Sequence, residues 1–247
     1  MAPLSVVIIT FNEEKNIERC LESVVPIAEE VVVLDSFSTD RTLEICQKWG
    51  VKVEQHPFDG HIQQKNRALE LATHDWVLSL DADEALSGAL QTSIQHWKEQ
   101  QHPIPAWMNR KTNYCGQWIH HSGWYPDRKL RLFNRKQARW GGQNPHDKIV
   151  LDPGVSATWI QGDLLHYSYY TVEEHLERAQ KYAQISAKAM KSNGKRLFWF
   201  QKYWNPVMKW LKCYLLRGGF RDGKAGWTIC KIAALETYWK YKLALKS

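Results

Sequence analysis

The chain lacks several features that would assign it to common protein classes. Its five cysteines form no C-x-x-C pair and no zinc-site spacing, which favours reduced thiols over a metal or disulfide framework. The N-terminus has no basic segment ahead of an apolar stretch, so no signal peptide is expected. In the C-terminal third, charged residues recur too often for a membrane-spanning helix. These absences predict a cytoplasmic location without a transmembrane helix.

Motifs of nucleic-acid recognition are also absent. The chain of 247 residues has a formal net charge of +7, which alone supports only non-specific attraction to polyanions. No RNP, KH, zinc-finger or helix-turn-helix pattern accompanies it. A basic nucleic-acid-binding module is the competing hypothesis from another class, and it rests on the net charge alone. We therefore expect no nucleic acid partner.

Apolar runs alternate with helical patterns through the first third of the chain. Runs at 4–10, 31–34, 51–54 and 76–80 are typical of buried strands. Helical spacing follows the first three, ending near Val24, Trp49 and Ala72. Strands that alternate with helices predict an α/β fold with a Rossmann-like, mostly parallel sheet flanked by helices.

Two carboxylates, Asp81 and Asp83, follow the fourth run directly. Open α/β sheets bind ligands at the carboxyl ends of their strands, and hard cations are shared between carboxylates and substrate phosphates. The pair therefore suggests a metal and nucleotide site, although such residues also begin turns or cap helices. The loop after the first strand, Thr10–Lys15, has no glycine, so a triphosphate cradle of the nucleotidyltransferase type is not expected. Glycosidases also use paired carboxylates, but a carboxylate pair beside a nucleotide-type sheet suits cation binding better than the hydrolysis of a glycosidic bond.

Four ordered segments, at 5–13, 32–40, 65–69 and 80–84, resemble the glycosyltransferases of family 2. Segments 123–133, 145–147 and 164–169 are similar to a narrower branch, which includes the lipopolysaccharide core β-1,4-glucosyltransferases. The resemblance implies a GT-A fold, a nucleotide-diphosphate sugar donor, a divalent cation (Mg²⁺ or Mn²⁺) and inversion at the anomeric carbon. A UDP-sugar is the expected donor, and a glycan or glycolipid of the lipopolysaccharide core or another envelope polymer is the expected acceptor. A soluble or polyprenyl-linked acceptor is the alternative.

The resemblance also implies a set of donor-binding residues: Thr10, Asn12, Glu13, Asp35, Lys65, Arg67 and Asp81. Asp35 ends a strand, where it can accept hydrogen bonds from a uracil or ribose or begin a turn. Lys65 and Arg67 are two residues apart on a helix and do not share a face, so we expect only one to reach the diphosphate.

The expected cation ligands are Asp83 and Asp81, the D-x-D motif. His166 is an additional candidate, as a ligand or a phosphate contact. A half-buried histidine satisfied by its neighbours is the alternative account.

Inverting transfer requires a base that takes the proton of the acceptor hydroxyl. The candidate is Asp147, which follows His146 where relatives carry an acidic residue, often the longer Glu. Alternatively, His146 and Asp147 form hydrogen bonds within a loop.

We expect residues 1–170 to form the GT-A domain, with a donor half at about 1–100 and an acceptor half at about 101–170. Trp118, Trp124 and Tyr125 belong to an aromatic-rich stretch. Aromatic rings stack on the apolar faces of sugars, so these three are candidate acceptor contacts. Core packing is the alternative.

Residues 171–247 form a predicted helical extension in which Lys and Arg interleave with Trp and Tyr. Cationic helices with an aromatic face suit the surface of an anionic leaflet. This pattern predicts a protein bound peripherally to the inner face of the cytoplasmic membrane. Ordinary packing of amphipathic helices fits the same spacing.

Overall fold

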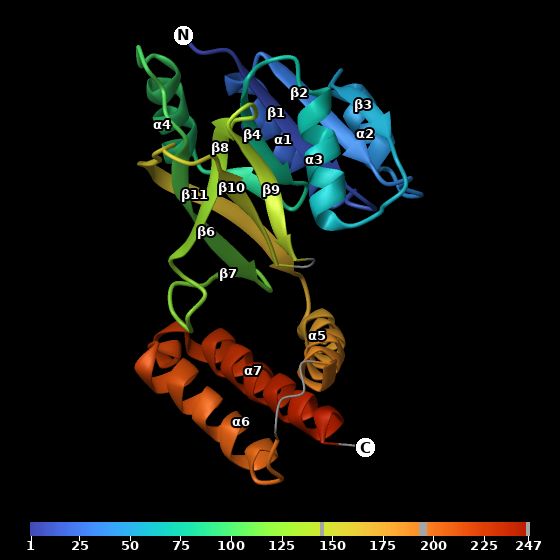
Figure 1. Cartoon of the computed structure of the whole chain (residues 1–247), viewed down its shortest axis with the longest axis vertical. Helices are drawn as coiled ribbons and strands as arrows, with labels where there is room; N and C mark the ends of the chain where they lie inside the picture. Colours follow the sequence, from blue (N-terminus) through green and yellow to red (C-terminus); the bar gives the residue numbers. More distant parts are fainter. Residues whose placement is uncertain (144–145, 193–196, 246–247) are drawn as a thin grey trace. The chain divides into compact units, whose positions relative to one another are not determined.

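A computed structural model describes residues 1–143, 146–192 and 197–245 of the chain (Figure 1). The chain forms two compact units. The first unit comprises Met1–Arg110 and Asp127–His166, and the second comprises Lys111–Pro126 and Tyr167–Ser247. Strands β6 (Ala106–Tyr114) and β11 (Thr158–Tyr169) run from one unit into the other.

The first unit is an α/β layer structure. Its remaining elements are β1 (Leu4–Thr10), α1 (Ile17–Val24), η1 (Val25–Ile27), β2 (Glu30–Asp35), α2 (Thr42–Lys48), β3 (Lys52–Gln55), α3 (His61–Leu71), β4 (Trp76–Asp81), β5 (Glu84–Leu86), α4 (Gly88–Lys98), β8 (Asp127–Asn134), β9 (Ala138–Gln143) and β10 (His146–Leu151).

The main sheet has the strand order β3-β2-β1-β4-β8-β6-β11-β5. The pairs β3-β2, β2-β1 and β1-β4 are parallel, whereas β4-β8, β8-β6 and β11-β5 are antiparallel. The chain leaves β1 toward β2 on one side and returns as β4 on the other. The carboxyl ends of β1 and β4 therefore flank a topological switch point, where α/β sheets open a crevice for ligands.

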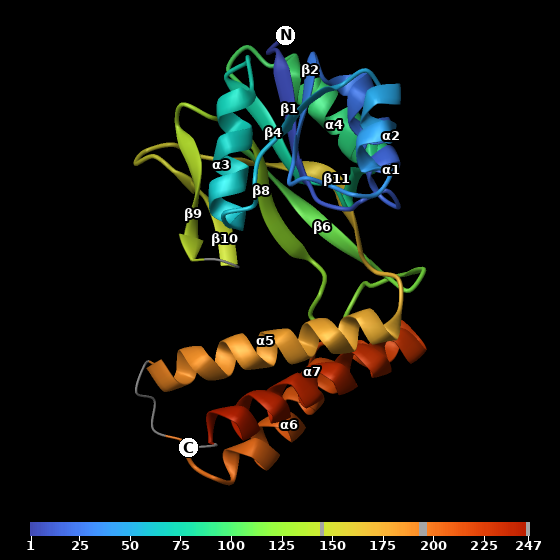
Figure 2. The same cartoon turned by 90° about the vertical axis from the view of Figure 1, so that its right-hand side faces the viewer.

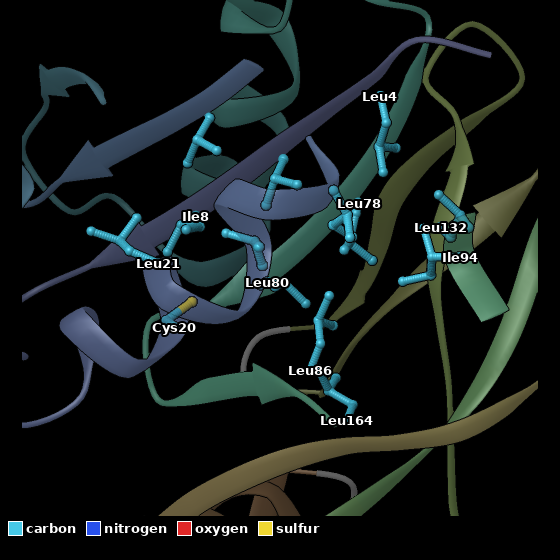
Figure 3. Close-up of a cluster of buried hydrophobic side chains, with 14 of the residues drawn as sticks. Leu4, Ile8, Cys20, Leu21, Leu78, Leu80, Leu86, Ile94, Leu132 and Leu164 are labelled. Carbon is cyan, nitrogen blue, oxygen red and sulfur yellow. The ribbon is translucent and has the colours of Figure 1, made fainter. Parts of the chain in front are cut away.

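Both faces of the parallel strands are buried. Leu4, Val6 and Ile8 of β1 belong to one apolar cluster, with side chains from α1 and α4 (Figure 3). Val7 points to the opposite face and joins a second cluster with α3. Burial on both faces explains the continuous apolar run of this strand, because side chains alternate between the faces of a sheet.

The second unit is mainly helical. It contains β7 (Gln117–Trp118), α5 (Val172–Ser192), α6 (Gln201–Leu211), the π-helix η2 (Lys212–Leu216), the 3-10 helix η3 (Gly219–Asp222) and α7 (Gly223–Ala244). In both views α7 lies between α5 and α6 (Figure 2). The loop that follows β7 is tied to the start of α7, since the buried Asp222 carboxylate accepts hydrogen bonds from the backbone N–H groups of His120 and His121.

These elements confirm the predicted α/β fold with flanking helices and a helical C-terminal extension. Within the described ranges, none of the helices combines the length and the apolar character needed to cross a bilayer. The domain boundary near residue 170 stays a prediction.

Candidate active site

The parallel sheet brings three candidate segments to one edge. Thr10 lies opposite Asp35 in the β1-β2 register, and Ile9 lies opposite Asp81 in the β1-β4 register. The loops that follow these strands carry the remaining candidates of the donor half. Because parallel strands end at the same edge, residues far apart in sequence become neighbours here.

Lys65 is the centre of an ion-pair cluster at this edge. Its side chain is 5% exposed, and its Nζ lies 3.0 Å from Asp81 Oδ1 and 2.8 Å from Asp147 Oδ2. The ammonium group also lies 4.3 Å from the centre of the Trp140 ring, a distance typical of a cation–π contact. The hairpin of β9 and β10 carries Asp147 to this lysine across 82 sequence positions. The structure thus brings together the residues predicted to contact the diphosphate, the cation and the acceptor proton.

Arg131 completes the cluster, and the sequence analysis missed it. It lies on β8 with 3% of its side chain exposed, and its Nη2 is 3.0 Å from Asp81 Oδ2 and 2.7 Å from Glu84 Oε1. Its guanidinium carbon lies 5.1 Å from the centre of the Trp140 ring. The sequence does contain a signal for this residue, because Arg131 stands inside the otherwise apolar run Leu130–Phe133. An arginine buried in such a strand needs an anionic partner.

Two members of the cluster, Asp81 and Arg131, are held in their charged forms. Burial would raise the pKa of the Asp81 carboxyl, but the positive charges of Lys65 and Arg131 outweigh burial and hold that pKa well below its usual range. Burial would lower the pKa of Arg131, yet the carboxylates of Glu84 and Asp81 raise it above its ordinary value. At neutral pH Asp81 is therefore an ionised carboxylate that is paired with Lys65 and Arg131.

Asp83 lies outside this network and faces His166. The imidazole Nε2 is 3.2 Å from Asp83 Oδ2, and the two side chains are 19% (Asp83) and 14% (His166) exposed. Strand β11 brings His166 here, opposite Glu84 of β5. In the described part of the chain, no three His, Cys, Asp or Glu side chains gather as a metal cluster. A carboxylate and an imidazole do suit a cation such as Mn²⁺ whose remaining ligands are diphosphate oxygens and water.

The other donor-half candidates order the loops at the edge. The Asn12 N–H donates to Ser38 Oγ at 2.8 Å, and Asn12 Oδ1 accepts from the Thr39 N–H at 2.8 Å. Asp35 is fully buried and accepts from the Ser38 N–H and from Gln55 Nε2, each at 2.9 Å. Asn12 therefore joins the loop after β1 to the loop after β2, and Asp35 joins the loop after β2 to the end of β3.

Thr10 and Glu13 flank the same loop. Thr10 is buried at the end of β1, and its Oγ1 has no hydrogen-bond partner within the described residues. Glu13 Oε2 accepts from Asn16 Nδ2 at 2.7 Å.

Arg67 points away from the cluster. Its Nη1 lies 3.3 Å from Asp59 Oδ2 and 3.0 Å from His56 Nδ1, and a third of its side chain is exposed. The two-residue offset from Lys65 places the two cations on different faces of α3. Of the two cations on α3, Lys65 is the one that pairs with Asp81 and Asp147.

The acceptor candidates belong to the second unit, where they contact protein rings. The ring centre of Trp118 lies 5.3 Å from that of Tyr167, which it meets edge-on. The ring centres of Trp124 and Tyr114 are 5.7 Å apart, and those of Tyr125 and His120 are 6.1 Å apart. Residues 144 and 145 and the side chain of His146, which belong to the predicted base motif, lie outside the described part of the chain.

Comparison with known proteins gives this arrangement a family context. The model described as glycosyl transferase family 2 matches residues 5–150. An uncharacterized glycosyltransferase of Rickettsia typhi is 30% identical over 261 residues, covering 100% of this chain and 89% of that protein. The lipopolysaccharide core biosynthesis glycosyltransferase LpsC of Rhizobium meliloti is 30% identical over 247 residues, covering 96% of this chain and 89% of LpsC.

A solved structure supports the fold. S. aureus TarS 1-349 in complex with UDP-GlcNAc aligns with a TM-score of 0.50 and 16% identity over 96% of this chain and 91% of that chain. This similarity confirms the predicted GT-A architecture.

Proposed function

Since the chain belongs to glycosyltransferase family 2, we propose that it transfers a sugar with inversion from a UDP-sugar to a cell-envelope glycan or glycolipid. The observation that carries the proposal is the convergence of Lys65, Asp81 and Asp147 at the edge of the sheet where ligands of such folds bind. The name of the relative LpsC supports an acceptor of the lipopolysaccharide core type. We place the enzyme at the inner face of the cytoplasmic membrane, where a lipid-linked acceptor would be met.

The donor diphosphate would be bound beside Lys65. The ammonium group of Lys65 is buried between two carboxylates, so an incoming diphosphate oxygen would compete with them for a charge-assisted hydrogen bond. Asn12 and Asp35 would support the nucleoside side, because Asn12 joins the loops after β1 and β2 and Asp35 fixes the loop after β2 against β3. Asp35 has its oxygens engaged by Ser38 and Gln55, so we assign it a positioning role. The UDP-GlcNAc complex of TarS makes a UDP-sugar the donor to test first.

Asp83 and His166 would hold the divalent cation, which when bound neutralises the charge that develops on the departing diphosphate. Asp83 suits this role better than Asp81, because Asp81 is already paired with Lys65 and Arg131. Asp81 would instead keep the two cations of the cluster in place.

Asp147 would act as the base. Its carboxylate is paired with Lys65 at 2.8 Å, and a diphosphate that binds Lys65 would weaken this pair. Asp147 could then accept the proton of the acceptor hydroxyl while that oxygen bonds to the anomeric carbon and the carbon–oxygen bond to the diphosphate breaks. In this scheme donor binding frees the base.

A donor screen tests the proposal. Purified protein is incubated with UDP- and GDP-sugars, with Mg²⁺, Mn²⁺ or EDTA, and release of free nucleoside diphosphate is measured. We expect slow, cation-dependent hydrolysis of one UDP-sugar. Adding the correct acceptor should release UDP faster, because the sugar is then transferred. A protein that is folded but neither binds nor hydrolyses any nucleotide-sugar with either cation contradicts the proposed function.

A further inference from the structure

The second unit presents a band of exposed apolar side chains along α6 and η2. Helix α6 (Gln201–Leu211) buries none of its residues. Trp199, just before it, is 72% exposed, Trp204 is 61% exposed, and Leu216 at the end of η2 is 83% exposed. We call this surface the α6–η2 face; it comprises the exposed apolar side chains of Trp199, Tyr203, Trp204, Val207, Leu215 and Leu216. A patch of this kind is uncommon on a protein that stays alone in water and marks an interaction site.

The helices of the unit leave this band uncovered. Among them, α6 makes its main contacts with α7 and η2, while α5 packs on α7 (Figure 2). Part of the face is hollowed into an open groove of about 570 Å³, lined by the rings of Trp199, Phe200, Tyr203 and Trp204 and by Val207. The lining is apolar, so methylene chains would fit it better than a polar ligand.

The charges of the chain segment that carries the face are all of one sign; Glu236 of α7 lies near Lys209 and partly offsets its charge. From Leu197 to Arg221 the chain carries Lys202, Lys209, Lys212, Arg217 and Arg221 and no acidic residue. The first acid that follows, Asp222, is buried, and its carboxylate accepts hydrogen bonds from His120, His121 and Ser122. Its negative charge is therefore directed inward, and the exposed Lys209 and Lys212 face the solvent without a neighbouring acid in this segment.

This combination selects one kind of partner. A second copy of the chain would bring the same basic residues against themselves, because a two-fold interface pairs a surface with its own copy. The headgroups of an anionic leaflet offer opposite charge, and the region just below them accepts tryptophan and tyrosine rings.

We propose that the α6–η2 face binds the surface of a bilayer that contains anionic lipids, with Trp199 and Trp204 inserted among the acyl chains and Lys209 and Lys212 at the headgroups. The proposal goes beyond transfer chemistry and does not require the enzyme to be active. It assigns membrane contact to α6 and η2 rather than to α5, whose basic residues Arg178, Lys181, Lys188 and Lys191 are offset by Glu173, Glu174 and Glu177.

Vesicle flotation tests the proposal with the full chain. Vesicles of phosphatidylcholine alone are compared with vesicles that contain phosphatidylglycerol, at low and at high salt. We expect binding to the anionic vesicles only, weakened by salt because the charges are screened. Lys209→Glu with Lys212→Glu should weaken binding at low salt at least about 30-fold, since each basic residue near an anionic surface contributes about fivefold.

Matched variants separate the face from general charge and from misfolding. Lys181→Glu with Lys188→Glu makes the same change at exposed positions of α5 and should retain most of the binding. Trp199→Ser with Trp204→Ser should abolish the blue shift of tryptophan emission on anionic vesicles. Because these side chains are exposed, circular dichroism and thermal unfolding should match those of the wild type.

Three outcomes would overturn the proposal. They are no binding to anionic vesicles at low salt, equal loss of binding in the α5 and α6 charge variants, or a dimer in solution that the Trp199→Ser and Trp204→Ser changes dissociate. The proposed function is tested separately, since donor hydrolysis is measured without vesicles.

Discussion

Lys65→Met removes the cation at the centre of the candidate active site. The Lys65 side chain is 5% exposed and is paired with Asp81 and Asp147. Removing one partner of a buried ion pair typically costs about 3–5 kcal/mol, because the remaining charge stays buried without compensation. Arg131 still neutralises Asp81 at 3.0 Å, and Asp147 is 14% exposed, so water can reach it. We therefore expect a loss of about 2–3 kcal/mol in the free energy of unfolding.

Arg67→Met is the matched control, because it makes the same type of change on the same helix. Arg67 pairs with Asp59 at 3.3 Å, and the two side chains are 35% and 43% exposed. Exposed ion pairs contribute at most about 1 kcal/mol. Urea unfolding near neutral pH, followed by circular dichroism, measures both variants against the wild type.

The loss in Lys65→Met should depend on pH with a definite sign. Against the effect of burial, Lys65 and Arg131 hold the folded-state pKa of Asp81 well below its usual range. The stabilisation is therefore fully present above the unfolded pKa of about 3.9, and it is lost as the pH falls toward the folded-state pKa. The difference between Lys65→Met and the wild type should be constant from neutral pH down to about pH 5 and shrink below about pH 4. Equal stability of Lys65→Met and Arg67→Met, or a difference that does not change in acid, would refute the reasoning.

Three further predictions concern single residues. Asp83→Ala should abolish cation-dependent turnover while the protein stays folded, because Asp83 lies at a loop end; full activity of this variant, or of the wild type in EDTA, contradicts the cation site. Asp147→Asn should lower the transfer rate at least about a hundredfold with little change in donor affinity, and a collapse of donor affinity with high residual turnover would move Asp147 to the donor site. Gly162→Ala should destabilise the fold by about 2 kcal/mol or more in thermal unfolding, because Gly162 has φ +99° and an added Cβ would lie 2.4 Å from the Leu90 nitrogen; a melting temperature like that of the wild type shows that α4 can shift.

The order of strands and helices in the first third of the chain could be read from local patterns. The runs at β1, β2 and β4 are apolar because both faces of these strands are buried. In the helices between them, apolar residues recur at helical spacing. Asp81 and Asp83 follow β4 directly in the sequence, and parallel pairing places this end beside the ends of β1 and β2. The α/β fold and the edge at which we propose that the donor binds were therefore predictable without coordinates.

The partners of each charge were decided only by the tertiary structure. Lys65 meets Asp147 across 82 positions, Arg131 reaches both Asp81 and Glu84 from another strand, and His166 comes to Asp83 on β11. The sequence showed that Lys65 and Arg67 lie on different faces of one helix, but not which of them joins the carboxylates.

The physical reason is the range of the interactions. Strand and helix periodicity arises from backbone geometry that repeats every few residues, so it is written in adjacent positions. A buried ion pair forms only where distant segments meet and exclude water, and its free energy depends on every group in that pocket. The sequence alone thus determined the parallel strands and the edge at which we propose that the donor binds, while the packing of β8, β10 and β11 against that edge decided which charges share it.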